Sequence, residues 1–319
     1  MATLSRRLLL TSSVSASVAL ALAACADTGA DGQAVASASE GAGGFDTAVA
    51  SGPVAADDVV AASTWATAIK NAGKLRTGGT KTSQVFSIED PATGKLTGFD
   101  AGLAQALARY IIGGDDAASL LEVTQVSSDT RETFLTNGSV DAVIATYTIT
   151  PERAQKITFA GPYYSSGQIV LVTSDNSEIT GVESLDGKKA AVQSNSTSAD
   201  ALAEKTPGAQ AVPFDTNSEC VAALTAGQVD AYVVDQALAL SEIAGNDSLK
   251  IVGDPFTDDP YGIGLPKDSD AQAFVNTFLE TIESDGTWDA IWQATIGAIL
   301  GGSAPEPPAI GSVPGSETA

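Results

Sequence analysis

Residues 127–164, SSDTRETFLTNGSVDAVIATYTITPERAQKITFAGPYY, contain the pattern that decides the fold. A helix-sized segment, Arg131–Asn137, stops at Gly138, and a β-rich run, Asp141–Thr146, follows it. After a threonine-rich turn, a second helix opens at Pro151, whose fixed φ suits the first position of a helix. Strand and helix signals that alternate in this way predict an α/β protein with mainly parallel sheets.

Two arginines in this stretch, Arg131 and Arg153, each stand at the start of a predicted helix. The free N–H groups and the dipole at a helix start favour anions. A guanidinium group added there can bind a carboxylate with two parallel hydrogen bonds. The stretch is therefore predicted to hold both acidic groups of a small dicarboxylic amino acid.

Two sets of such strand–helix units predict two α/β lobes of ordinary domain size, and the family resemblance given below implies that two crossover strands join them. The 319 residues are enough for two compact domains. The expected divisions are a signal peptide over 1–24, a lipidated flexible tether over 25–56, a first lobe over 57–164 and 258–300, a second lobe over 168–254 and a disordered tail over 301–319. The crossovers near 165–167 and 255–259 are the expected hinges.

Composition excludes several classes of function. The formal net charge of −23 provides no basic stripe for nucleic acid. The absence of histidine removes the imidazole groups of catalytic triads and of many zinc sites. Asp254, Asp258 and Asp259 lack the dense spacing of a calcium loop and are expected to be turn residues. We therefore expect no metal, no cofactor and no catalysis.

The first 24 residues combine a cationic start with a short Leu/Val/Ala core, a pattern that is typical of an export signal. The end of this segment, Leu22-Ala23-Ala24-Cys25, resembles a bacterial lipobox, which implies a lipid on Cys25. A plain secretory signal with an incidental cysteine is the alternative. The run Ser5-Arg6-Arg7 also permits twin-arginine export.

The chain resembles the amino-acid-binding family of bacterial ABC-importer receptors over about Leu75–Ile296, and more specifically the glutamate/aspartate type. The motifs that carry the resemblance are Gly98-Phe99-Asp100, Val140–Ala145, Thr148–Arg153, Phe159–Tyr164, Val192–Ser198, Gly227–Ala231 with Asp235, and Gly286-Thr287-Trp288. The resemblance implies a monomeric extracytoplasmic receptor, anchored to the cell membrane by lipid. Such a receptor captures an amino acid between two lobes and delivers it to a permease and its ATPase.

The ligand-binding residues that the resemblance implies are Lys81, Arg131, Thr146, Thr148, Arg153, Ser196, Thr197 and Asp235. In this reading Arg153 takes the α-carboxylate and Asp235 takes the α-ammonium group. A buried charge that is left unpaired costs several kcal/mol, so a zwitterion requires both partners. Lys81 and Arg131 are expected to hold a second carboxylate, which favours glutamate or aspartate over a neutral amide.

Several alternatives stay open. Arg131 could be a solvated charge beside Glu132, Lys81 an exposed loop lysine and Asp235 a helix cap. The same scaffold could bind glutamine or another amino acid, act as a dehydratase-like enzyme or serve a sensor. Two positions depart from the family pattern: Gly102 replaces a usual acid on a presumed helix surface, and Asn195 replaces a common glycine.

Overall fold

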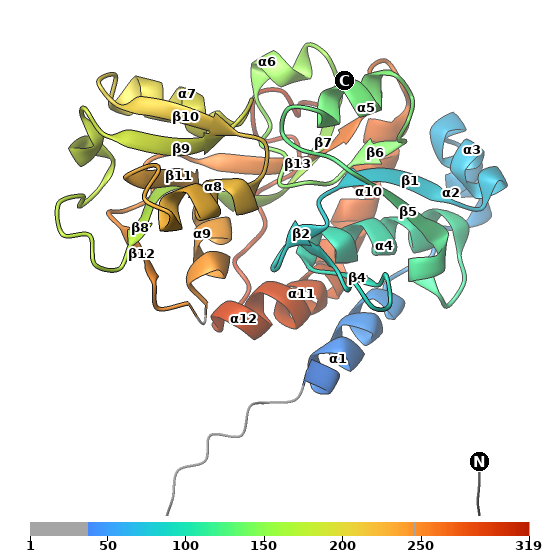
Figure 1. Ribbon diagram of the computed structural model, residues 1–319. Helices are drawn as coiled ribbons and strands as arrows, with labels where there is room; N and C mark the ends of the chain where they lie inside the picture. Colours follow the sequence, from blue (N-terminus) through green and yellow to red (C-terminus); the bar gives the residue numbers. More distant parts are fainter. Residues whose placement is uncertain (1–37, 245, 319) are drawn as a thin grey trace, which may run out of the picture. The chain divides into compact units, whose positions relative to one another are not determined.

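The computed structural model describes residues 38–244 and 246–318, and its strands form two five-stranded sheets and one small three-stranded sheet (Figure 1). The first sheet, in the order β5–β1–β6–β13–β7, consists of β1 (Leu75–Gly79), β5 (Leu121–Gln125), β6 (Ala142–Val143), β7 (Thr158–Ser166) and β13 (Asp259–Leu265). The second, in the order β10–β9–β11–β8–β12, consists of β8 (Gln168–Thr173), β9 (Lys189–Gln193), β10 (Gln210–Phe214), β11 (Ala231–Asp235) and β12 (Leu249–Val252). The small sheet consists of β2 (Thr82–Ser83), β3 (Ser87–Glu89) and β4 (Leu96–Thr97).

Helices cover both large sheets, and each sheet with its helices is here called a lobe. The helices of the first lobe are α1 (Ala38–Ala50), α2 (Asp57–Ala61), α3 (Thr64–Ala72), α4 (Phe99–Ile112), η1 (Ala117–Leu120), α5 (Arg131–Thr136), α6 (Pro151–Ala154), α10 (Ala271–Ser284), α11 (Thr287–Trp292), the π-helical turn η3 (Gln293–Gly297) and α12 (Ala298–Leu300). Those of the second lobe are η2 (Val182–Leu185), α7 (Thr197–Lys205), α8 (Asn217–Thr225) and α9 (Gln236–Ile243).

One strand in each large sheet runs against its neighbours. In the first sheet β13 is antiparallel to both β6 and β7, and in the second β8 is antiparallel to both β11 and β12. These are the strands by which the chain enters each sheet from the other lobe. The sheets are therefore mixed, and the two-lobed α/β fold expected from the sequence is confirmed.

The two crossovers are joined by side-chain hydrogen bonds. Ser165 Oγ donates to Asp258 Oδ1 at 2.5 Å, and the Gln168 backbone N–H donates to Thr257 Oγ1 at 2.7 Å. The Gln168 side chain also donates to Asp259 Oδ2 at 2.7 Å. Both aspartates thus bind the neighbouring crossover, which keeps the two connections side by side.

An aromatic core fixes the first lobe. The stripe of Phe99, Leu103, Leu107 and Tyr110 on α4 is buried, as its helical spacing predicts. The Phe99 ring meets Trp288 of α11 edge to face, with ring centroids 5.4 Å apart. Helix α4 is therefore held between the first sheet and the C-terminal helices.

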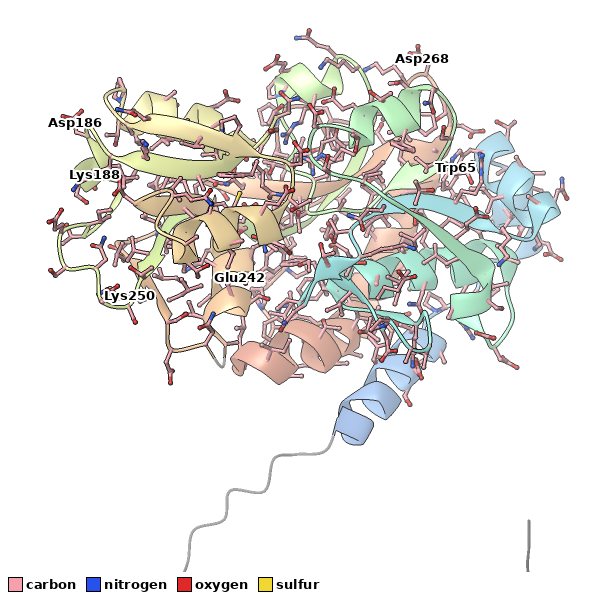
Figure 2. The ribbon with its side chains drawn as sticks, in the orientation of Figure 1. Trp65, Asp186, Lys188, Glu242, Lys250 and Asp268 are labelled. Atoms are coloured by element: carbon pink, nitrogen blue, oxygen red, sulfur yellow. The ribbon has the colours of Figure 1, made fainter. Side chains whose placement is uncertain are left out.

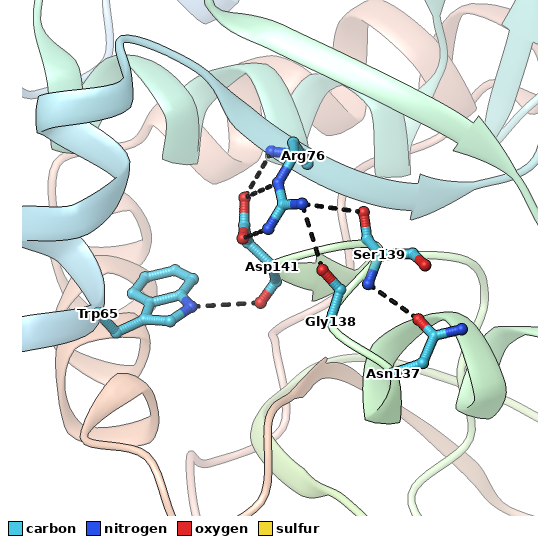
Figure 3. Close-up of polar contacts among 6 residues, drawn as sticks. All are labelled: Trp65, Arg76, Asn137, Gly138, Ser139 and Asp141. Atoms are coloured by element: carbon cyan, nitrogen blue, oxygen red, sulfur yellow. Dashed lines mark hydrogen bonds and ion pairs between the residues drawn. The ribbon is translucent and has the colours of Figure 1, made fainter.

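Asp141, which belongs to the stretch 127–164, holds the beginning of β1 through Arg76 (Figure 3). Its carboxylate accepts hydrogen bonds from the backbone N–H and the guanidinium group of Arg76, and its carbonyl accepts one from Trp65 Nε1 at 3.2 Å. Arg76 also donates to the carbonyls of Gly138 and Ser139. This cluster explains why a polar residue stands inside an otherwise apolar run, and it lies away from the cavity described below.

The expected flexible tether over 25–56 is corrected in part by helix α1. Phe45 and Val49 of this helix are each only 2 % exposed, and α1 packs against α4 and α11. A Cβ at Gly102 would lie 3.2 Å from the Phe45 ring and 2.6 Å from Ile291 Cγ2. Gly102 is therefore buried beneath α1 and is not on a helix surface. The signal peptide and Cys25 lie outside the described residues.

The expected disorder of the tail over 301–319 is also corrected. The Gly311 N–H donates to the Gly161 carbonyl at 2.9 Å, and Ser316 is completely buried. The sequence misled here because glycine and proline, which are frequent in this segment, lower helix and strand propensity without preventing an irregular segment from packing.

Charged side chains lie on the periphery of the second lobe. Lys188, which pairs with Glu178 at 2.6 Å, and Lys250 lie at its outer end, together with Asp186 (Figure 2). Within residues 38–244 and 246–318, no helix combines the length and the apolar character that crossing a bilayer requires.

Replacing Phe45 with alanine tests the docking of α1. Because the ring fills the space above Gly102, its loss should lower the free energy of unfolding by about 3 kcal/mol. Urea unfolding followed by circular dichroism measures the change. An unchanged midpoint would show that α1 is not held against the first lobe in solution.

Candidate ligand-binding site

The guanidinium groups of two buried arginines lie over the ring of Tyr147. The guanidinium carbon of Arg131 lies 3.8 Å from the ring centroid and that of Arg153 lies 5.3 Å from it. Arg131 is only 4 % exposed and Arg153 only 8 %. A cation over an aromatic face is stabilised by the ring quadrupole, more strongly where water is excluded. The turn between β6 and α6 therefore brings the two guanidinium groups together.

Arg131 is a buried cation with unused hydrogen-bonding capacity. Its Nη1 donates to the Ala145 carbonyl at 2.9 Å, and its Nε is buried without a hydrogen-bond partner among the described residues. Burial, and next the charge of Arg153, lower the pKa of Arg131 to about 9. No carboxylate in the described part of the chain forms an ion pair with either guanidinium group.

Arg153 connects the two lobes. Its helix, α6, begins after Thr150, whose side chain caps the Arg153 N–H at 3.2 Å. Arg153 Nη1 donates to the Thr148 carbonyl at 2.9 Å within the first lobe, and Nη2 donates to the Asn195 carbonyl of the second lobe at 3.0 Å. The guanidinium group is thus held at the boundary between the lobes.

Asn195 makes a second contact across this boundary. Its side-chain amide donates to the Asp129 carboxylate of the first lobe. Asn195 has a φ of +54°, in the left-handed region that favours glycine, and asparagine tolerates this region better than most residues. The loop therefore keeps a backbone conformation suited to the glycine that the resemblance suggested, and it adds a side-chain contact that glycine lacks.

Gln168 brings the predicted residues of the second lobe together. This fully buried side chain donates from Nε2 to Asp235 Oδ1 at 3.0 Å and to Thr197 Oγ1 at 3.5 Å. Its Oε1 is buried and has no hydrogen-bond partner among the described residues. Burial, and next the carboxylate of Asp259, raise the pKa of Asp235 to about 8.

Asp100 holds the turn that presents Thr146. Thr146 has a φ of +44°, which is strained for a β-branched residue, and its N–H donates to Asp100 Oδ2 at 2.7 Å. The hydroxyl of Tyr163 donates to the other oxygen of Asp100 at 2.8 Å. Burial raises the pKa of Asp100 to about 7, against the opposing effect of these hydrogen bonds.

A cavity between the lobes lies beside Arg131 and Thr146. Its other lining residues are Thr80, Thr82, Ser83, Gln125, Val126, Ser127, Ser128 and Ala145 of the first lobe and Gln193, Asp215, Thr216, Asn217 and Leu238 of the second. Arg131 is the cationic residue of this lining and Asp215 is the acidic one. The cavity suits a small polar solute.

Of the eight predicted residues, only Arg131 and Thr146 line this cavity, and Arg153, Thr197 and Asp235 are outside its lining. Lys81 is outside its lining, and its Nζ pairs with Glu89 Oε1 of β3 at 3.1 Å. Ser196 lies at the start of α7 and donates from Oγ to the Gln193 carbonyl at 2.7 Å. Thr148 contributes its carbonyl to Arg153. The binding roles of these residues stay predictions.

Sequence reasoning missed Tyr147, Gln168 and Asp100 as parts of the site. One signal was present for Gln168, because it is the single polar residue that opens the apolar strand QIVLVT. Tyr147 stands inside the threonine-rich turn and resembles an ordinary core aromatic. Asp100 lies 46 positions from Thr146, so their contact depends on tertiary structure.

These features define a solute-binding protein in which two lobes enclose a polar cavity, and the sequence comparisons agree. Residues 75–298 match the family model of bacterial extracellular solute-binding proteins, family 3. The chain belongs to this family, which confirms the resemblance at the level of the family.

Relatives within the family are named for different ligands. The ABC transporter glutamine-binding protein GlnH of Bacillus subtilis is 37% identical over 72% of this chain and 83% of its own length. The glutamate-binding protein GluB of Corynebacterium efficiens is 33% identical over 63% of this chain and 72% of its own length. An ancestral arginine-binding protein bound to glutamine is 35% identical, with a TM-score of 0.63 over 72% of this chain and 99% of that one.

The buried carboxyl group of Asp100 makes stability depend on pH. Its folded-state pKa of about 7 lies above the usual value of 3.8, so it contributes stability below pH 4 that is lost as the pH rises through 7. Asp100→Asn removes this dependence. The free energy of unfolding of the wild type should fall more steeply between pH 5 and 7 than that of the variant, by up to about 1.4 kcal/mol per pH unit. Urea titrations that give parallel pH profiles would contradict this.

Asn195→Gly tests the contact between Asn195 and Asp129. The variant keeps the carbonyl that Arg153 contacts and relieves the positive φ, so only the side-chain hydrogen bond is lost. A hydrogen bond of about 1 kcal/mol corresponds to a roughly fivefold faster release of bound solute. Stopped-flow fluorescence measures this rate. Asp129→Ala should have the same effect, and the double variant should release no faster than either single one. Additive effects would show that the two side chains act separately.

Proposed function

We propose that the protein binds glutamate, or aspartate, in the cavity between its lobes and releases it chemically unchanged. The observation that carries this proposal is Arg131, a buried cation with a free Nε and no ion pair to a carboxylate among the described residues. A buried charge without a counter-charge is strongly destabilising. A ligand that brings a carboxylate to Arg131 removes that cost, and a neutral side chain does not.

The remaining charges suit the head group of an amino acid. Arg153, held between the lobes, is the proposed partner of the α-carboxylate, and the turn at Thr148 and the start of α7 at Thr197 are proposed to assist it. Asp235 and the free Oε1 of Gln168 are the proposed acceptors for the α-ammonium group. The ammonium charge would stabilise the carboxylate form of Asp235 and lower its raised pKa.

The preference for a dicarboxylate rests on Arg131 alone. Lys81, proposed from the resemblance as a second cation for the ligand, is already neutralised by Glu89. The guanidinium groups of Arg131 and Arg153 instead both lie over the ring of Tyr147. Two carboxylates of one small molecule can therefore approach two neighbouring cations.

Glutamine is the second candidate. The relative with 37% identity is named as a glutamine-binding protein, and the cavity is lined by the amide side chains of Gln125, Gln193 and Asn217. These groups can both donate to and accept from a ligand amide. Glutamine differs from glutamate in leaving the charge of Arg131 uncompensated.

The same comparison supports a role of the protein in transport. We infer that it delivers its ligand to an ABC permease and its ATPase, as the name of the Bacillus subtilis relative suggests. The family is described as extracellular, and a lipid on Cys25 would keep this protein, as a monomer, at the outer face of the cell membrane. Mass spectrometry of the protein isolated from membranes would detect the lipid.

Arg131→Met tests the assignment of the ligand. Removing one member of a desolvated charge pair costs about 2–5 kcal/mol, which is a loss of at least roughly thirtyfold in affinity for glutamate. Binding of glutamine should change much less. Isothermal titration calorimetry with glutamate, aspartate, glutamine, asparagine and arginine measures both effects.

Arg76→Met is the matched control, because Arg76 is partly exposed and binds Asp141 away from the cavity (Figure 3). It should keep the affinity of the wild type for the ligand. If Arg131→Met binds glutamate as tightly as the wild type, the assignment of the second carboxylate to Arg131 is wrong. If the wild type prefers glutamine, the second candidate replaces the first.

A further inference from the structure

The tail that follows the family domain lies against the part of the first lobe that carries the two arginines. The family model ends at residue 298, so the tail over 301–319 is an addition to the domain. From α12 the tail returns across the first lobe, and its last part lies beside α6 (Figure 1). The segment over 311–317, here called the C-terminal strap, makes the contacts described next.

Hydrogen bonds fasten the C-terminal strap at both ends. At its start, the Gly311 N–H donates to the Gly161 carbonyl at 2.9 Å. At its end, Gln272 Nε2 of α10 donates to the carbonyls of Ser316 at 3.4 Å and Glu317 at 3.1 Å. Ser316 is fully buried and donates from Oγ to the Val313 carbonyl at 2.9 Å. The segment is therefore a packed part of the lobe.

Between these attachments, Val313 packs against the apolar cluster to which Tyr147 belongs. This buried cluster also contains Ile149, Ile157 and Phe159. The Tyr147 and Phe159 rings meet edge to face, with centroids 4.8 Å apart. Tyr147 thus has arginines on its ring and belongs to an apolar cluster that Val313 helps to cover.

Gly315 is in close contact with α6. It has a φ of +98°, and a Cβ at this position would lie 3.0 Å from Ala154 Cβ and 3.2 Å from the Thr150 carbonyl oxygen. Helix α6 has only four residues, and so short a helix has little stability of its own. Its position depends on its neighbours, among them the strap and Lys267, which donates to the Ala154 carbonyl at 2.6 Å.

We propose that the C-terminal strap is a positioning element of the ligand-binding site, which holds α6 and Tyr147 so that Arg153 and Arg131 meet the ligand preorganised. The inference rests on the proposed role of these arginines in binding and applies to whichever amino acid the site takes. Holding a binding group in its productive geometry before the ligand arrives reduces the entropy lost on binding. Without the strap, part of this entropy would be lost when the ligand binds, and the affinity for the ligand would be lower.

Truncation after Ala309 and the graded pair Gly315→Ala and Gly315→Val test the strap. Phe45→Ala is the control, because it removes buried contacts of the first lobe where α1 packs. Phe45 is not part of the apolar cluster that contains Tyr147. The truncated protein should bind its amino acid at least tenfold more weakly by calorimetry at a temperature where it is folded. The two glycine variants should lose affinity in order of side-chain size. Phe45→Ala should lose stability and keep its affinity.

Hydrogen exchange of the ligand-free protein separates this proposal from the proposed function. Truncation should speed the exchange of amides over residues 147–157 more than elsewhere in the first lobe, whatever the ligand. Unchanged exchange over this segment, or faster exchange with unchanged affinity, would overturn the positioning role. If the wild type binds no amino acid, the proposed function fails, and the exchange result alone then decides whether the strap holds α6.

Discussion

The interaction on which the site depends is the stacking of two buried guanidinium groups on the ring of Tyr147, without an acidic partner in the described part of the chain. Burial of the two charges is costly, and the repulsion between like charges so close to each other adds to this cost. The pKa of Arg131 falls to about 9 for these reasons. The protein tolerates the arrangement because backbone carbonyls and an aromatic face partly replace water around the two cations. In the proposed function, the carboxylates of the ligand would compensate the rest of their positive charge.

The architecture places complementary groups in the other lobe. Gln168 stands where the chain first crosses between the lobes, and it binds both Asp235 at the end of β11 and Asp259 on the second crossover. Burial, and next the carboxylate of Asp259, raise the pKa of Asp235 to about 8, so its charged form is also costly in this position. In the proposed function, an amino-acid zwitterion between the lobes would offset both costs at once, so that closure and binding would favour each other. Membership of the solute-binding family agrees with this division of charge between two lobes.

The sequence predicted those features that depend on local pattern. The strand and helix periods, the core stripe of α4, the helix start at Pro151 and the two lobes follow from hydrophobic spacing, turn residues and the resemblance. It did not predict contacts made at long range, such as the bond of Asp100 to Thr146 or the pairing of Lys81 with Glu89. The low-complexity ends were misread for a related reason. Helix α1 and the C-terminal strap are ordered by packing against the first lobe, and composition alone does not reveal the surface on which a segment packs.

A crystal structure of the protein grown with glutamate would show whether the two arginines bind the two carboxylates of the ligand. We expect one carboxylate on Arg153 and the other on Arg131, each at about 2.7–2.9 Å as in other charge-assisted hydrogen bonds. We also expect the ligand ammonium group beside Asp235 and Gln168. A ligand whose side-chain carboxylate points to solvent, with Arg131 still without an anionic partner, would rule out this mode of binding.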